Sequence, residues 1–295
     1  MGIEIKSAPN GVQPGSVTKF IFTGKVQAFA LGLGAFKLTY GNSSNSVQNF
    51  SIKLLPIQTE DAAVTGNVVS VQVNAELQDA SGHTVDVADS LIYPVCVAMV
   101  DTFDPKTLLT NVTGIADASS DPVQLPGSSG FSALASFLSG FAFNYSEGDH
   151  VFMGASAGCG INNNQSEGRV NGYASLYDGH GNNATSSVDA GVIASTEPKP
   201  GFAIEQVNNQ TEVNIQVKFP SLTSIGQVFC LLSSWQVQYD GGYSLETISA
   251  GVFGVPTFNG NTVTLPNLYA RVNDSSGNNQ NDTKSSATAL VIALP

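Results

Sequence analysis

The sequence predicts an all-β protein built from three tandem, homologous antiparallel β-sandwich repeats, immunoglobulin-like or jelly-roll in type, of about 95–100 residues each. Three observations carry this prediction. Two short signatures recur three times in the same order, the stretches between turns alternate apolar and polar residues, and convincing helical periodicity is scarce.

The first signature is a turn motif that occurs as AELQDASGH, ASLYDGHGN and ARVNDSSGN. Its aspartates lie 99 and 96 residues apart. In a hairpin built on a type I turn, Asp accepts backbone N–H bonds and Gly supplies a left-handed conformation. We therefore predict three structural turns, held by Asp79 and Gly82, Asp178 and Gly181, and Asp274 and Gly277. The last position is His83 in one copy and Asn182 or Asn278 in the others, so it is the least shared part of the motif.

The second signature lies upstream and reads AFKLTY, GFAFNY and SWQVQY. Each copy places an aromatic residue four positions before a tyrosine, with an apolar residue midway, which puts all three on one face of a strand. The pairs are Phe36 with Tyr40, Phe141 with Tyr145, and Trp235 with Tyr239. Each repeat then closes on an apolar run, PVCVAMV, AGVIAST or ALVIALP, typical of a central strand covered on both faces.

Further strands are expected in VQNFSIKLL and in the alternating segment 69–77, where every second residue is apolar. The best helical candidate is GFSALASFLSG, yet it stands where the other copies read as strand. Prolines and glycines in DTFDPKT and STEPKPG favour extended connectors. Domains are therefore expected at 1–101, 102–197 and 198–295, each long enough to fold around a core of its own.

The amino-acid composition argues against two classes of binding partner. A formal charge of −12 with only 11 Lys and Arg residues argues against nucleic acid and anionic membranes. No segment approaches the roughly 18 apolar residues of a spanning helix, so no transmembrane insertion is expected. The first residues lack the apolar core of a signal peptide. That leaves the destination open, including release or surface exposure by a route without a signal peptide.

Cysteines and histidines give little sign of chemistry. Cys96 and Cys230 lie in apolar runs and are expected to be buried strand thiols rather than a disulfide, and Cys159 to be a strand or turn residue rather than a nucleophile. No nucleophile elbow, phosphate loop, dinucleotide fingerprint, zinc pattern or calcium loop is present. We expect no enzyme activity, catalytic residue, cofactor or metal. Whether Asp178 and His180 share an ion stays open at this point.

Binding is the remaining possibility. The residues after each tyrosine, GNSSNSV, SEGDHVF and DGGYSLE, are polar and differ between copies, and recognition usually lies in loops that vary on a common scaffold. The alternative for any one loop is a solvated hairpin tip. The candidate binding residues are Asn42, Asn45, Asp149, His150, Asp240 and Tyr243.

These features favour a non-enzymatic, multivalent recognition protein, lectin-like or adhesive, whose partner is a glycan or a cell-surface ligand. The first alternative is a structural protein that assembles with copies of itself into a fibre, coat or inclusion through strand edges. The second is a β-rich toxin module that acts on cell surfaces.

Overall fold

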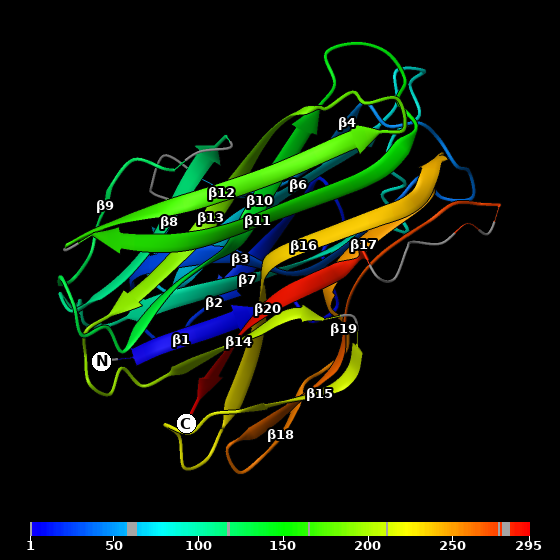
Figure 1. The fold of residues 1–295 in the computed structure, drawn as a ribbon. Coiled ribbons are helices and arrows are strands. Elements are labelled where there is room, and N and C mark those ends of the chain that lie inside the picture. The colour runs from blue at the N-terminus through cyan, green and yellow to red at the C-terminus, as the bar shows by residue number, and fades with distance from the viewer. Residues whose placement is uncertain are drawn as a thin grey trace.

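The protein is all-β (Figure 1). The computed structural model describes residues 2–57, 64–116, 119–164, 166–210, 212–276, 278 and 284–295. These residues form three antiparallel sheets, two of seven strands and one of six. Across the same ranges, no helix has the length and apolar character needed to cross a membrane.

The strand order of each sheet follows. The first sheet runs β1 (Gly2–Ser7), β7 (Leu91–Val100), β3 (Val26–Thr39), β17 (Thr247–Val252), β19 (Thr262–Asn273) and β15 (Glu212–Lys218), and β18 (Thr257–Asn259) pairs with β19. The second runs β2 (Ser16–Ile21), β6 (Val68–Gln78), β4 (Asn49–Pro56), β10 (Ala133–Asn144), β13 (Thr185–Ser195) and β8 (Thr107–Ile115), and β5 (Val64–Thr65) pairs with β6. The third runs β14 (Ala203–Gln210), β20 (Ser286–Leu294), β16 (Gln227–Tyr243), β11 (Phe152–Asn164), β12 (Glu167–Asp178) and β9 (Val123–Gln124).

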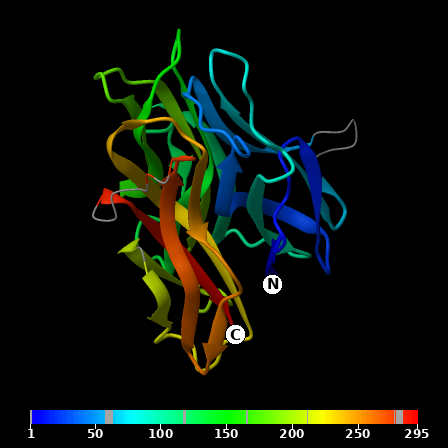
Figure 2. The same cartoon turned by 90° about the vertical axis from the view of Figure 1, so that its right-hand side faces the viewer.

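Every sheet is shared between two of the three predicted segments. Strands β1, β7 and β3 from the first segment continue into β17, β19 and β15 from the third, and the other two sheets join segments two and one, and three and two. We call the three places where the segments meet, β3 with β17, β10 with β4 and β16 with β11, the seams. Hydrogen-bonded strands therefore link the segments in addition to the connecting chain. Figure 2 shows both chain ends on the same side of the molecule.

The three apolar closing runs form β7, β13 and β20, and each lies between two neighbouring strands of its sheet. Burial on both faces explains why these runs do not alternate in polarity. The segment at 130–140, the best helical candidate of the sequence, is largely β10, a strand as in the other copies. Phe137 of this strand packs in one core cluster and Leu138 in the other. Because both faces of the strand are buried, its sequence does not alternate between apolar and polar residues.

An aromatic cluster marks the centre of the molecule. Phe36 of β3, Phe141 of β10 and Trp235 of β16 are buried, and their ring centroids are 5.2–5.3 Å apart in all three pairs. Rings at this spacing in tilted or edge-on arrangements add to the free energy gained by burial. The residues that the second signature placed on separate strands thus meet one another, one from each sheet.

Candidate functional site

The three predicted turns have the same hydrogen-bond geometry. In each, one carboxylate oxygen of the aspartate accepts the backbone N–H of the residue four positions later at 2.8 Å. The backbone N–H of the aspartate donates to the carbonyl of that residue at 3.1–3.2 Å. Gly82 and Gly181 have φ of 96° and 89°, in the region that favours glycine, while Gly277 lies outside the described residues.

The fifth residue of each turn also takes part through its side chain. The second carboxylate oxygen of the aspartate lies 2.6 Å from His83 Nδ1, 2.7 Å from Asn182 Nδ2 and 2.7 Å from Asn278 Nδ2 in the respective turns. The fifth position, which is His in one turn and Asn in the other two, is therefore shared in its bonding. A histidine Nδ1 and an asparagine Nδ2 lie at a similar distance from their own backbone, and both can donate a hydrogen bond.

The turn aspartates are buried anions. Asp79 and Asp178 are each 3% exposed. Burial would raise the pKa of both carboxyls. Hydrogen bonds from His83 to Asp79, and from Asn182 and His150 to Asp178, outweigh that effect and hold the pKa of both carboxyls below the ordinary value. The first two turns therefore each carry a negative charge inside the fold.

The two signatures of the sequence meet in space. Burial raises the pKa of the Tyr40, Tyr145 and Tyr239 hydroxyls above the ordinary value. The negative charge of the turn aspartate in the same segment, Asp79, Asp178 or Asp274 respectively, raises it further. The tyrosine of each aromatic signature thus lies close to the aspartate of its turn, although the two residues lie in, or directly after, strands of different sheets.

The loops that follow the three tyrosines gather around these turns at the upper right of Figure 1. We call this region, residues 41–47, 146–150 and 240–246 with the turn residues 79–83, 178–182, 274–276 and 278, the apical end. Its loops are joined by strand bridges between Asn45 and Leu245 and between Val47 and His150. One loop from each segment therefore contributes to one continuous surface.

Each loop also contacts the turn of another segment. Ser44 Oγ accepts the backbone N–H of Ser275 at 2.6 Å. Asp149 accepts the backbone N–H of Ala80 at 2.7 Å through one oxygen and the hydroxyl of Ser81 at 2.9 Å through the other. The third contact is a close backbone approach, because a Cβ added to Gly179 would lie 3.3 Å from the Cα of Gly242. These three contacts close a ring of loops and turns.

The six candidate binding residues all lie at the apical end, but with different surroundings. Asn42 and Asp240 are exposed, and Tyr243 is 36% exposed with its ring edge-on to Tyr239 at 5.2 Å. Asn45 donates to Ser43 Oγ at 3.0 Å. Asp149 is exposed and also holds the first turn, as described above.

His150 has a structural environment. Its ring stacks on Tyr145 with centroids 3.8 Å apart, its Nδ1 lies 2.8 Å from Asp178 Oδ2 and its Nε2 lies 2.9 Å from the carbonyl of Glu147. At the corresponding place, two residues before β4 and β17, the other segments have the buried Val47 and Leu245. His150 thus covers a tyrosine ring as an apolar residue would, and hydrogen-bonds as well.

The described residues show no group of three or more metal-ligating side chains. His180 Nδ1 lies 4.0 Å from Asp178 Oδ2, an oxygen that already faces Asn182 and His150. Cys96, Cys159 and Cys230 are free thiols. Burial raises the pKa of the Cys159 and Cys230 thiols to about 12, so little thiolate is present near neutral pH.

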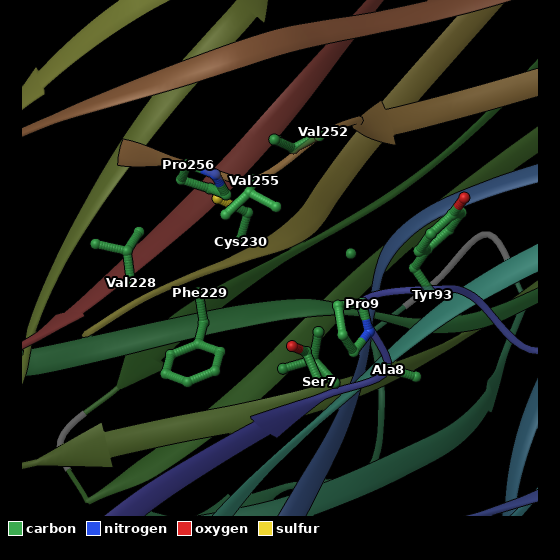
Figure 3. A pocket seen from close by; sticks show the side chains of 13 residues that line it. Ser7, Ala8, Pro9, Tyr93, Val228, Phe229, Cys230, Val252, Val255 and Pro256 are labelled. Atoms are coloured by element: carbon green, nitrogen blue, oxygen red, sulfur yellow. The ribbon is translucent and has the colours of Figure 1, made fainter. Parts of the chain in front are cut away.

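The structure also contains a cavity that no sequence motif indicated. It has a volume of about 400 Å³ and lies where the end of β1, strand β7 and the first half of β16 come together (Figure 3). Ser7, Ala8 and Pro9 line one side, and Val228, Cys230 and Val255 the opposite side. Its walls come from residues more than two hundred positions apart, which is why sequence patterns could not reveal it.

No protein-family model matches the chain, and no curated protein shows significant similarity to it.

Proposed function

We propose that the protein is a non-catalytic recognition protein, lectin-like or adhesive, and that the apical end is its ligand-binding surface. The observation that carries this proposal is the contrast within that end. Three turns of equal geometry support three loops of different sequence, which meet in one ring. A rigid framework that presents variable loops is the usual arrangement of a recognition surface.

The exposed side chains of the apical end suit a sugar. Asn42 offers an amide, Asp149 and Asp240 offer carboxylates, and Tyr243 offers part of a ring face. Amides and carboxylates hydrogen-bond to hydroxyl groups, and an aromatic ring packs against the apolar face of a pyranose. Because the three loops differ, we expect one composite site per chain rather than three equal sites. Multivalent attachment would then require several chains on one surface.

We further infer that the chain consists of three homologous β-sandwich repeats. Each sheet joins the first, last and third main strands of one segment to the fourth, fifth and second main strands of another, in the same order in all three sheets. Within a segment the two halves also face each other, as β12 packs on β13 and β19 on β20. This arrangement supports a common origin of the segments and an approximate threefold relation between them.

A self-assembling structural protein is the second candidate. Strand β2 lies at the edge of its sheet and exposes Val17 (49%) and Ile21 (62%). Aliphatic side chains on a free strand edge favour pairing with another chain. Light scattering after size exclusion tests this candidate. A monomer at all concentrations would contradict it, and particles that Val17→Lys disperses would support it.

A glycan array tests the recognition proposal. We expect a defined set of glycans to bind the intact protein, and Tyr243→Ala to reduce the signal at least about ten-fold with the thermal unfolding midpoint nearly unchanged. Tyr173→Ala is the matched control, because Tyr173 is a 50% exposed tyrosine on β12. Absence of signal from the intact chain, or an equal loss in both variants, would contradict the proposal.

A further inference from the structure

The three long strands β3, β10 and β16 lose one neighbour part of the way along. Strand β16 pairs with β11 only from Ser234 onward, and within the described chain no strand pairs with this edge between Gln227 and Ser233. The same holds for β3 before Ala35 and for β10 before Gly140. Backbone N–H and C=O groups on such an edge need other partners.

Corresponding positions on these strands can be identified from the structure. Each strand has a register shift two residues before its central aromatic, at Leu33/Ala35, Leu138/Gly140 and Leu232/Ser234. Five residues before the aromatic stand Leu31, Ser136 and Cys230. The neighbouring edge strands place Asn111 opposite Gly191, Gln206 opposite Leu290 and Ser7 opposite Val95.

Where β3 crosses β8 and β13, a carboxamide completes the edge. Asn111 Oδ1 accepts the N–H of Leu31 at 2.8 Å, and Asn111 Nδ2 donates to the carbonyl of Phe29 at 3.2 Å. Gly191 makes the close approach possible, since a Cβ at this position would lie 2.5 Å from Leu31 O. This crossing is closed by the protein's own side chain.

Where β16 crosses β1 and β7, no carboxamide side chain of the described chain fills the position that corresponds to Asn111. Ser7 stands where Asn111 stands, and its side chain is one bond shorter and has no amide group. Val95 stands where Gly191 stands and also lines the cavity. The 400 Å³ cavity lies here, lined by Ser7, Val95, Val228 and Cys230 among others (Figure 3).

The backbone of β16 directs a donor and an acceptor toward this cavity. In an antiparallel pair only every second residue bonds to the neighbouring strand, and the residues between point their N–H and C=O groups to the other edge. Leu31 and Phe29 point that way in β3. Cys230 and Val228 hold the corresponding positions in β16 and line the cavity. Each group left without a partner on this edge costs about 1–3 kcal/mol where water is excluded.

We propose that this cavity binds a small uncharged molecule that carries a primary carboxamide. The carboxamide oxygen accepts from Cys230 N–H and its NH₂ donates to Val228 C=O, as Asn111 does for β3. The remainder of the ligand packs on Val252, Val255, Pro256 and Tyr93. No charged side chain lines the cavity, so a carboxylate or ammonium ligand would lose hydration without gaining a partner. The volume falls in the range of small-molecule sites.

The crossing of β10 over β14 and β20 does not support the same proposal. Gln206 stands there in the place of Asn111 and carries a carboxamide of its own, one methylene longer. The cavity at this crossing, about 590 Å³, is also lined by the acidic Glu205. Among the three crossings of the described chain, the one at Ser7 combines an unpaired strand edge with a cavity that neither a charged side chain nor a carboxamide side chain lines.

Titration of the ¹⁵N-labelled protein with benzamide and with benzoate, followed by NMR, tests the proposal. The two probes share a ring and differ in the carboxamide. We expect benzamide to shift the Cys230 amide resonance saturably, and benzoate to bind at least about ten-fold more weakly. N-acetyl-asparagine methylamide distinguishes the sources, because tighter binding than benzamide would indicate an asparagine side chain of a partner chain. Equal shifts with benzamide and benzoate, or an unmoved Cys230 resonance with every probe, would overturn the proposal.

A pair of variants keeps the test independent of the probes. Ser7→Asn places a carboxamide at the position of Asn111, so benzamide binding should fall at least about ten-fold while the unfolding temperature rises. Ser7→Ala, the matched control, should bind benzamide as the original protein does. Undiminished benzamide binding by Ser7→Asn would contradict the proposal, and neither variant alters the apical end.

Discussion

The three turns of the apical end and the three strand crossings at the centre respond differently to a change of residue. In the turns, the fifth residue is a histidine in one copy and an asparagine in the other two, and it makes the same bond to the aspartate in all three. At the crossings, Asn111 makes its bonds to β3, whereas Ser7 in the corresponding place leaves a cavity. A contact is kept when the residue at the corresponding position can still place a hydrogen-bond donor or acceptor at the same point in space, and it is lost when the side chain is too short.

Packing explains the rest of the difference. The fifth residue of the first turn lies at the surface, where the larger ring of His83 finds room: its side chain is 57% exposed, whereas that of Asp79 is 4% exposed. The crossings are enclosed, so the absence of a side chain at Gly191 is as important as the presence of Asn111. Corresponding positions in the three segments therefore make the same hydrogen bonds at the apical end and different contacts at the central crossings.

The largest effect is expected from Gly191→Val, which gives the closed crossing the residue of the open one. The new side chain would collide with Phe137 and with the carbonyl of Leu31, and relief requires β3 to move. We expect the free energy of unfolding to fall by about 3 kcal/mol or more. Urea denaturation measures it. Gly160→Val is the control, because a Cβ there has open space; an equal loss in both variants would refute the steric argument.

The next effect concerns the buried anions of the turns. Asp178→Ala removes the acceptor of bonds from Asn182, His180 and His150, and we expect the free energy of unfolding to fall by about 2–3 kcal/mol. Asp79→Ala should cost less, because Asp79 has no partner that corresponds to His150. Chemical denaturation of both variants tests the order, and a larger loss in Asp79→Ala would show that His150 contributes nothing.

The pH dependence should follow the same carboxylate. The pKa of Asp178 in the folded protein is held below that of an unfolded aspartate, which is about 3.9. Its contribution to stability is therefore complete above pH 4 and is lost as the pH falls toward the lower, folded-state value. The slope contributed is at most about 1.4 kcal/mol per pH unit. Unfolding in urea between pH 2 and 6 measures it, and Asp178→Asn should be less sensitive to acid than the original protein.

The smallest effect is expected from His83→Asn, which changes the first turn into the form of the other two. Since Asn182 and Asn278 make the same bond, stability should stay within about 0.5 kcal/mol of the original. His83→Ala should lower it by about 1 kcal/mol, because the Asp79 carboxylate loses its side-chain donor. Equal effects of the two substitutions in thermal and urea unfolding would show that the bond to His83 is unimportant.

Local patterns in the sequence predicted the strands well, for physical reasons. Alternation in 69–77 reports a strand with one covered face, and the repeated Asp and Gly report a turn whose bonds are local. The segment at 130–140 lacked clear alternation because β10 contributes to core clusters on both faces. The sharing of sheets between segments had no signal, since pairing of β3 with β17 depends on residues two hundred positions apart.

The candidate site shows the same limit. The six predicted binding residues lie at one end because Asn42, Asn45, Asp149 and His150 follow strands that end there, and Asp240 and Tyr243 are among the last residues of β16. The contacts at the strand crossings could not be predicted from the sequence. Asn111 stands in an Asn-Val-Thr triplet that resembles a chance glycosylation motif, Gly191 lies in an apolar closing run that indicated only a buried strand, and Ser7 belongs to no pattern. Their roles come from contacts between segments, which one sequence alone does not reveal.

Residue-level hydrogen exchange of the Leu31 and Cys230 amides tests the central claim most directly. If a carboxamide closes one crossing and the corresponding place in the other is open, the Leu31 N–H, bonded to Asn111, should exchange at least about ten-fold more slowly than the Cys230 N–H. Asn111→Ser should remove most of this difference. Protection of Cys230 equal to that of Leu31 in the ligand-free protein would contradict the account.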